Sequence, residues 1–200
     1  MSFYKNGIGI YTKDLVKLIH ILNSNDIVKS INDNFEDLIN IIPEIQNMVG
    51  FEHNHPHHHL NVWEHTLYAL SLSPNNFEIR LALLLHDVGK PFCFQEGSDG
   101  VRHFKGHAIK SAIISKAILT RLAFKENYIK EICKLITLHD TPLLQSEIDE
   151  NPRGSYIRFC VQKCDALAHN PEKNERRLAY IEKMEKLFKL YKNAVFIEKE

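Results

Sequence analysis

Apolar residues recur along most of the chain at intervals of three and four, which places them on one side of a helix. The strict alternation typical of a β-strand is nearly absent. Thr12 is expected to cap the first helix, and Ser24 or Asn25 the second. The pattern predicts an all-α protein with helices at about 13–22, 26–39, 43–49, 62–72, 77–88, 107–122, 126–139, 155–168 and 171–195.

Local signals mark several helix ends. Asn61 and Glu64 have the spacing of a capping box, so a helix is expected to begin one residue after Asn61. Gly89 and Pro91 end the long apolar helix that precedes them. Residues 92–106 contain three glycines and few periodic apolar residues, which predicts a loop in which any strand is short.

The composition is that of an ordinary globular protein. The 25 basic and 25 acidic residues cancel, and no block of like charge indicates an arm that binds nucleic acid. The N-terminus lacks a targeting signal and no apolar run approaches the roughly 18 residues of a membrane span, so we expect a cytoplasmic protein. The cysteines form no CxxC pair and are expected to be reduced core residues: Cys93, Cys133, Cys160 and Cys164.

The length is compatible with one domain, because domains usually contain about 50 to 250 residues. We expect a single domain over 1–200, with an N-terminal helical extension at 1–50, a core at 51–170 and a docking helix at 171–200. The docking helix carries an apolar stripe that would pack against the core: Leu178, Ile181, Met184, Phe188 and Tyr191.

Histidine is the residue type with an unusual distribution. Nine of the twelve histidines fall between His53 and His107. Any one histidine on an apolar side of a helix is more typical of a hydrogen-bonded core residue than of a metal ligand. Helical spacing places five ionisable side chains on such interior-facing sides: His65, His86, His107, His139 and Asp165.

Taken together, these side chains are costly to bury unless a cation is present. A buried carboxylate costs on the order of several kcal/mol unless it is paired or bound to a metal. Neither Asp87 nor Asp165 has an Arg or Lys at helical spacing on its buried side. Imidazole nitrogens combined with carboxylate oxygens suit Zn, Mn, Fe, Ni or Co better than Ca. Mg is kept as a further possible ion. One or two divalent ions are therefore predicted.

The stretch LALLLHDVGK is predicted to be the end of a buried apolar helix. Its apolar run is followed by two polar residues, His86 and Asp87. Neighbouring residues on a helix point about 100° apart, so both side chains could face one ion only at the helix end. Gly89 is expected to let the chain turn away there. Lys90 would then meet an anion brought to the metal.

The chain resembles the HD superfamily of metal-dependent phosphohydrolases in the order of its buried ionisable residues: His65, His86, Asp87, His107, His139 and Asp165. HHHLNVWEHTLYAL, LALLLHDVGKP, HFKGHAIKSA and RLAF resemble the HD domain of CCA-adding tRNA nucleotidyltransferases, and IIPEIQNMVGFEH resembles the segment before it. The resemblance covers about 35–170 and implies an HD helical bundle. The Gly-Ser loop and paired aspartates of the nucleotidyltransferase domain are absent, so we expect a stand-alone HD domain that does not add CCA.

The resemblance implies hydrolysis of phosphate monoesters or diesters in small nucleotides. Its nearest precedents are 2′,3′-cyclic nucleotides and 2′-nucleotides. It also implies a primary metal site made of His65, His86, Asp87 and Asp165. A second ion would be held by His107 and His139, with Asp87 as the bridge.

Other residues near this set are expected to contact the substrate or the solvent. Lys90 is expected to bind phosphate and to act in catalysis with the nearby aspartate of the HD pair. His103 and Arg158 are further candidates for substrate contact. The histidine-rich loop at 53–59 would be a substrate lid or, more simply, a solvated loop. Asp140 is expected to cap a helix end or to be solvated.

Three alternatives stay open at this point. A module that binds tRNA or another partner would carry a structural metal and use a basic patch of Lys110, Lys116, Arg121 and Lys125. A dinucleoside polyphosphate hydrolase or a di-iron oxygenase would use a similar ligand set. The sequence leaves the substrate, the number of ions and the oligomeric state open.

Overall fold

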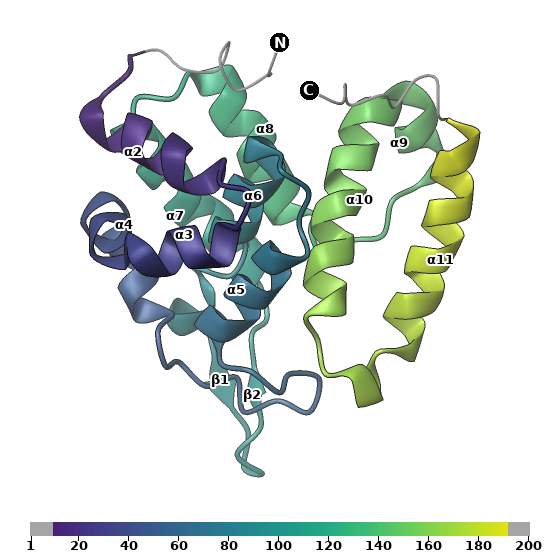
Figure 1. The fold of residues 1–200 in the computed structure, drawn as a ribbon. Coiled ribbons are helices and arrows are strands. Elements are labelled where there is room, and N and C mark those ends of the chain that lie inside the picture. Colours follow the sequence, from purple (N-terminus) through teal and green to yellow (C-terminus); the bar gives the residue numbers. More distant parts are fainter. Residues whose placement is uncertain (1–9, 192–200) are drawn as a thin grey trace.

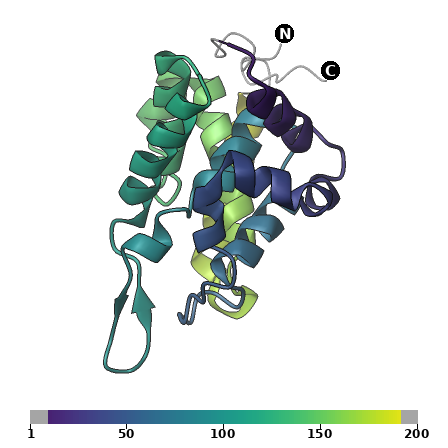
Figure 2. The same cartoon turned by 90° about the vertical axis from the view of Figure 1, so that its left-hand side faces the viewer.

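A computed structural model describes residues 10–191 and confirms the all-α fold class (Figure 1). The α-helices are α2 (Lys13–Leu22), α3 (Ile27–Asp33), α4 (Phe35–Ile41), α5 (Val62–Ser71), α6 (Phe77–Leu85), α7 (His107–Arg121), α8 (Glu126–Thr137), α9 (Gln145–Glu150), α10 (Pro152–Leu167) and α11 (Glu175–Leu190). The short 3₁₀ helices are η1 (Pro43–Asn47), η2 (Lys90–Phe92) and η3 (Pro171–Lys173). Strands β1 (Gln95–Glu96) and β2 (Arg102–His103) form an antiparallel hairpin that projects beyond the helices (Figure 2).

Two predicted helix caps are confirmed by their hydrogen bonds. The Thr12 hydroxyl accepts a hydrogen bond from the amide of Leu15 at 3.1 Å, which satisfies a free donor at the start of α2. At α5, the Glu64 amide donates to Asn61 Oδ1 at 2.9 Å, and the Asn61 amide donates to Glu64 Oε2 at 3.2 Å. This reciprocal capping box sets the start of α5, from which His65 projects inward.

The second predicted helix is in fact two helices. It breaks at Asn34, whose side-chain amide donates to the carbonyl of Ser30 at 2.8 Å and thereby competes with the backbone ladder. The cap of α3 is Asp26 rather than Ser24 or Asn25, because the Asp26 carboxylate accepts from an amide in the first turn. The cap prediction was therefore wrong by one to two residues.

Helix α6 lies inside the larger core. All of its residues are buried, and α2, α5, α7, α8 and α10 contact it. A helix surrounded in this way has no solvent-facing side, which explains the unbroken apolar run in the sequence. Arg80 is buried on the same helix because its guanidinium donates to the carbonyls of Leu22 and Ser24, both at 2.7 Å.

The C-terminal helix α11 lies beside α10 (Figure 1). Within the predicted apolar stripe, Leu178 stays 44% exposed, and residue 195 lies outside the described residues. Helix α9 was not predicted; it supplies one residue to the small core under α11. This core consists of Leu143, Ile148, Phe159, Ala166, Ile181, Met184 and Phe188.

The four cysteines are free thiols, as predicted. Cys160 and Cys164 are buried, and Cys93 and Cys133 are half-buried. No helix within residues 10–191 is long and apolar enough to cross a membrane.

Candidate metal centre

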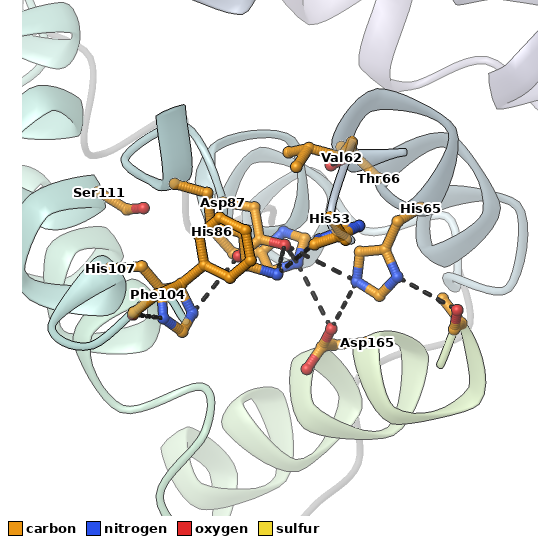
Figure 3. Close-up of polar contacts among 12 residues, drawn as sticks. His53, Val62, His65, Thr66, His86, Asp87, Phe104, His107, Ser111 and Asp165 are labelled. Atoms are coloured by element: carbon orange, nitrogen blue, oxygen red, sulfur yellow. Dashed lines mark hydrogen bonds and ion pairs between the residues drawn. The ribbon is translucent and has the colours of Figure 1, made fainter. Parts of the chain in front are cut away.

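The predicted ionisable residues meet at one buried place, to which α5, α6, α7, α8 and α10 or the turns after them contribute. Figure 3 shows His65, His86, Asp87, His107 and Asp165 at this place. The contributing residues are His65 of α5, His86 and Asp87 after α6, His107 of α7, His139 after α8 and Asp165 of α10. All are buried except His107, whose side chain is 15% exposed. Residues up to 100 positions apart in the chain are thus neighbours.

The four histidines share one hydrogen-bonding pattern. In each ring, Nδ1 lies within 3.1 Å of a backbone carbonyl oxygen: Ala168 for His65, Leu83 for His86, Phe104 for His107 and Ile136 for His139. Because a carbonyl can only accept, Nδ1 carries the proton of each neutral ring and Nε2 keeps a lone pair. Histidines that bind a metal through Nε2 typically have this arrangement.

The Nε2 atoms point toward other acceptors. His65 Nε2 lies 2.8 Å from Asp165 Oδ1, and His86 Nε2 lies 3.2 Å from Asp87 Oδ2. Two acceptors at such distances repel each other unless a proton or another cation lies between them. The geometry therefore demands positive charge at the point where these side chains meet.

Several buried acceptors also lack donors. Within residues 10–191, His86 Nε2 and both carboxylate oxygens of Asp87 accept no hydrogen bond. Asp87 Oδ2 has the Lys90 ammonium at 2.7 Å, so His86 Nε2 and Asp87 Oδ1 are the atoms left without a donor among the described residues. Leaving such an atom unsatisfied costs about 1 to 3 kcal/mol, and more for a charged group. A bound cation would satisfy both atoms, so the residues present fit a metal ion.

The donor atoms fall into overlapping groups in which every pair of atoms lies within 4.8 Å. One group contains His65, His86 and Asp87, and another contains Asp87, His107 and His139. Imidazole nitrogen combined with carboxylate oxygen suits a divalent transition metal. Asp87 belongs to both groups, so its carboxylate is in a position to be shared by two ions.

Electrostatics keep the carboxylates ionised. Burial raises the pKa of Asp87, but the charges of His86 and Lys90 outweigh burial and hold that pKa well below its usual range. Burial lowers the pKa of His86, but the carboxylates of Asp87 and Asp165 outweigh burial and raise it to about 10. Without a metal, the His86 ring therefore holds a proton at neutral pH.

Lys90 lies beside the metal ligands. Its Nζ is 2.7 Å from Asp87 Oδ2, an ion pair without hydrogen-bond alignment, and 2.9 Å from His53 Nε2. His53 Nδ1 donates to the carbonyl of Leu60 at 2.8 Å, so its Nε2 is free to accept from the ammonium. The expectation that Asp87 has no cation on its buried side was wrong, because η2 turns Lys90 back toward Asp87.

Gly89 is needed for close packing rather than for a turn. The chain turns over residues 86–89, as expected, but the Gly89 φ of −84° is one that any residue adopts. A Cβ at this position would lie 2.5 Å from the amide nitrogen of Ser111 and 2.9 Å from the carbonyl oxygen of His107. The Gly89 amide also donates to Ser111 Oγ at 2.9 Å. The missing side chain lets α7 approach the His86–Asp87 turn and so places His107.

A cavity of about 180 Å³ lies next to the ligands. Its lining includes the predicted site residues Lys90, His103, His107, His139 and Asp165. It also includes His55 and His58 of the loop that was considered as a substrate lid, and four residues that were not predicted to belong to the site: Phe104, Asp140, His169 and Arg177.

Arg158 is not part of this lining, which corrects the expectation of substrate contact. Its Nε donates to the carbonyl of Leu138 at 3.2 Å, one terminal nitrogen pairs with Glu147 at 2.9 Å, and the other donates to the carbonyl of Thr141. Two of the three guanidinium nitrogens therefore bind the segment that connects α8 to α9, and the third binds Glu147 of α9. Arg158 fastens that segment to α10.

Asp140 contacts the site, in contrast to the expected capping or purely solvated role. Its Oδ2 lies 3.2 Å from His107 Nε2 and 3.5 Å from His139 Nε2. Burial raises its pKa, but the two histidines outweigh burial and lower it to about 2. An ionised carboxylate, 44% exposed, therefore lies at the edge of the cavity.

His169 is a buried residue of the site that the sequence reading missed. Its Nδ1 donates to the carbonyl of Asp165 at 2.9 Å, and it forms a group of donor atoms with His65 and Asp165. The interval of four residues between Asp165 and His169 was the available signal, because such residues lie on the same side of a helix.

The histidine-rich loop at 53–59 has mixed surroundings. His53 is buried against Lys90, His55 is half-buried at the cavity, and His57 is exposed. None of the described groups of possible metal ligands includes a residue of this loop. The carbonyl of His57 accepts from the amide of Asn170 at 2.9 Å, which attaches the loop to the chain after α10.

Comparison with known proteins gives consistent results. Residues 56–168, more than half of the chain, match the HD domain family. The chain is 39% identical over 132 residues to the CC-adding tRNA nucleotidyltransferase of Thermus thermophilus, covering 63% of this chain and 29% of that protein. It is 40% identical over 88 residues to the A-adding tRNA nucleotidyltransferase of Deinococcus radiodurans, covering 41% and 20%. The chain thus spans less than a third of the length of these curated relatives.

Proposed function

Because this chain belongs to the HD domain family, we propose that it hydrolyses phosphate esters of small nucleotides with one or two divalent transition-metal ions. The HD domain indicates the superfamily of metal-dependent phosphohydrolases. We take 2′,3′-cyclic nucleotides and 2′-nucleotides as the substrates to test first.

The observation that carries this proposal is the shared orientation of four histidines. Each ring donates its Nδ1 proton to a backbone carbonyl. This leaves Nε2 of His65, His86 and His107 near the buried carboxylates of Asp165 and Asp87, and Nε2 of His139 near Asp140 and His107. A cluster without any cation would instead pair these nitrogens with donors. A bound divalent ion supplies a water of lowered pKa and offsets negative charge on a phosphoryl oxygen.

The chain's own residues would bind and orient the phosphate. Lys90 presents a cation to the cavity and is held by His53 through the 2.9 Å contact. Burial lowers the pKa of His139, which keeps this ring neutral and able to bind a cation. The Asp140 carboxylate lies at the cavity edge, where it can accept a hydrogen bond from a water molecule.

The size of the cavity favours a small reacting group. Pockets that enclose a complete drug-sized ligand usually measure about 300 to 1,000 Å³, whereas this cavity measures about 180 Å³. We therefore propose that the phosphate and part of the ribose enter while the base stays outside. This arrangement predicts weak discrimination among bases. It also keeps dinucleoside polyphosphates as alternative substrates, because their second half could extend into solvent.

The RNA-binding alternative has less support. Arg121, one of the four residues of its basic patch, pairs with both carboxylate oxygens of Glu44 at 2.8 and 2.9 Å. This pairing offsets part of the positive charge that an RNA phosphate would need. We therefore favour a small substrate over tRNA.

The proposal is tested by metal analysis followed by a hydrolysis panel. The protein should be purified without a polyhistidine tag and its metal content measured. The ion found should then be restored to chelator-treated protein before assay with 2′,3′-cyclic nucleotides, 2′-nucleotides, 3′- and 5′-nucleotides and dinucleoside polyphosphates.

We expect bound transition metal, hydrolysis of at least one ester, loss of activity with chelator and recovery with the ion. Rates should differ only several-fold among the four bases. Absence of hydrolysis of every ester by metal-loaded protein would reject the proposed function. Salt-dependent tRNA binding by that inactive protein would favour the binding module. Iron in the anaerobically purified protein, combined with no hydrolysis, would favour the oxygenase.

A further inference from the structure

Arg177 enters the phosphate cavity from outside the segment that matches the family. It lies in the first turn of α11 and lines the same cavity as Lys90. The family match ends at residue 168, before α11 begins. The C-terminal helix therefore contributes a side chain to the site as well as packing against α10.

The position of Arg177 is set by contacts before and at the start of α11. The buried side chain of Asn174, which precedes the helix, donates to the carbonyl of Ala166 at 2.6 Å. The amide of Asn170 donates to the carbonyl of His57 at 2.9 Å. These bonds join the beginning of α11 to the end of α10 and to the histidine-rich loop, so the Arg177 backbone is held at the cavity.

Arg177 has no partner among the described residues. Its half-buried side chain makes no hydrogen bond or ion pair within 10–191, whereas Arg158 and Arg102 are each paired with a glutamate. The other lysine or arginine in the cavity lining, Lys90, already contacts Asp87 and His53. Arg177 is thus the cation in the lining whose donors are all available.

The charge of Arg177 also reaches the cavity. Burial lowers the pKa of His55, which lines the cavity, and the charges of neighbouring side chains, Arg177 included, lower it further. A guanidinium has five donors in a planar fork that matches two oxygens of one phosphate. An uncommitted guanidinium beside a phosphate-sized cavity therefore has the chemistry of an anion receptor.

We infer that Arg177 binds the substrate phosphate, so that the C-terminal helix completes the site and favours phosphate monoesters. A monoester carries a charge of about −1.5 to −2 near pH 7 and has three non-bridging oxygens. A cyclic diester carries a single charge and has two such oxygens, which leaves fewer for Arg177 once a metal and Lys90 bind them. This inference rests on the proposed function and names its preferred ester.

The test compares Arg177→Gln and Arg177→Lys with Arg176→Gln. Arg176 is the neighbouring arginine, is exposed and is not part of the cavity lining, so its variant controls for the loss of one positive charge on α11. Inorganic phosphate should be titrated into each metal-loaded protein by calorimetry. Steady-state constants should be measured with 2′-AMP and 2′,3′-cyclic AMP, and metal content and the melting temperature should be recorded for every variant.

In Arg177→Gln, we expect the phosphate Kd and the KM for 2′-AMP to rise about ten- to a hundredfold, the loss typical of a charged hydrogen bond. The KM for the cyclic ester should rise less, and kcat should change less than KM. Arg177→Lys should recover part of the loss, and Arg176→Gln should stay within about twofold of wild type.

Equal phosphate affinity in Arg177→Gln and Arg176→Gln would overturn this inference and leave the proposed function standing. Equal losses on the monoester and the cyclic ester would overturn the preference for monoesters. A wild-type protein that neither binds phosphate nor hydrolyses any ester would overturn the proposed function and this inference together. The melting temperature and the Arg177→Lys variant separate a binding defect from misfolding.

Discussion

The Nε2 atoms of His107 and His139 lie 3.2 Å apart, although both rings donate Nδ1 protons to backbone carbonyls. Two neutral rings in this arrangement would direct lone pairs at each other. Positive charge must therefore lie between or beside them, as a proton or as a metal ion. The same condition holds where His65 faces Asp165, so the requirement extends across the whole buried cluster.

Replacing His139 with Ala is expected to remove one of two bound ions. His139 belongs to the groups of possible ligands that contain Asp87 with His107 and Asp140 with Asp165, and to neither group that contains His65. The loss should therefore reach the second ion and spare the ion held at His65. The metal-to-protein ratio of dialysed protein, measured by plasma mass spectrometry, should fall from about two to about one. His59→Ala is the control, because His59 is an exposed loop histidine outside every donor group. An unchanged ratio in His139→Ala would contradict the assignment of the second ion.

Metal binding is expected to release a proton. In the metal-free protein the pKa of His86 is raised to about 10, so its ring is protonated at pH 8, whereas a metal ligand must be neutral. Metal affinity should therefore weaken as the pH falls. Calorimetric titration with the metal should be done at pH 8 in two buffers of different ionisation enthalpy. The two binding enthalpies should differ by the difference between the buffer ionisation enthalpies multiplied by the number of protons released, which is about one for His86. Identical enthalpies in both buffers would argue against His86 as a ligand.

Gly89→Ala is expected to destabilise the fold by roughly 1 to 3 kcal/mol and to weaken metal binding. The added Cβ would lie 2.5 Å from the backbone of Ser111, so α7 and its His107 would have to move. Chemical denaturation and metal titration measure the two effects. Gly97→Ala is the matched control, because its Cβ would lie close only to the side chain of exposed Asp99 and at an ordinary 3.5 Å from the Val101 carbonyl oxygen. Equal stability of the two variants would show that the close approach is unimportant.

His53→Ala is expected to lower kcat/KM by about 10- to 100-fold without removing a metal ligand, because Lys90 loses the acceptor that orients its ammonium. His53→Gln retains an acceptor oxygen and should recover part of the activity. Steady-state kinetics and metal content, measured together, separate the two effects. Loss of bound metal in His53→Ala would instead indicate that the loop supports the ligands directly.

Much of the site could be predicted because helical spacing shows which side of a helix faces the core. His139 shares a stripe with Ile132 and Ile136, and Asp165 shares one with Val161. These faces are properties of single helices, so local periodicity is enough to assign them. The resemblance to the HD superfamily then indicated which helices meet, which periodicity alone cannot do.

The errors fall where one element meets another. Arg158 is seven residues before Asp165, about 10.5 Å along the helix, and acceptors of the segment after α8 take its donors. Asp140 follows the end of α8, where the turn directs its carboxylate toward His107 of another helix. The close approach of Ser111 to Gly89 was not predicted, because a packing contact with another helix leaves no trace in the local sequence. Arg177 lies beyond the resembling segment, and only the packing of α11 brings it to the cavity.

The most direct test of the central claim is the hydrolysis rate of Asp87→Asn with the best substrate of the panel. Asp87 belongs to two groups of possible ligands, one with His65 and His86 and one with His107 and His139, so removal of its charge should lower kcat roughly 10³-fold or more while the far-ultraviolet circular dichroism stays helical. Asp99→Asn, which changes an exposed aspartate of the hairpin, should keep full activity. Full activity of Asp87→Asn would contradict a metal centre built on Asp87.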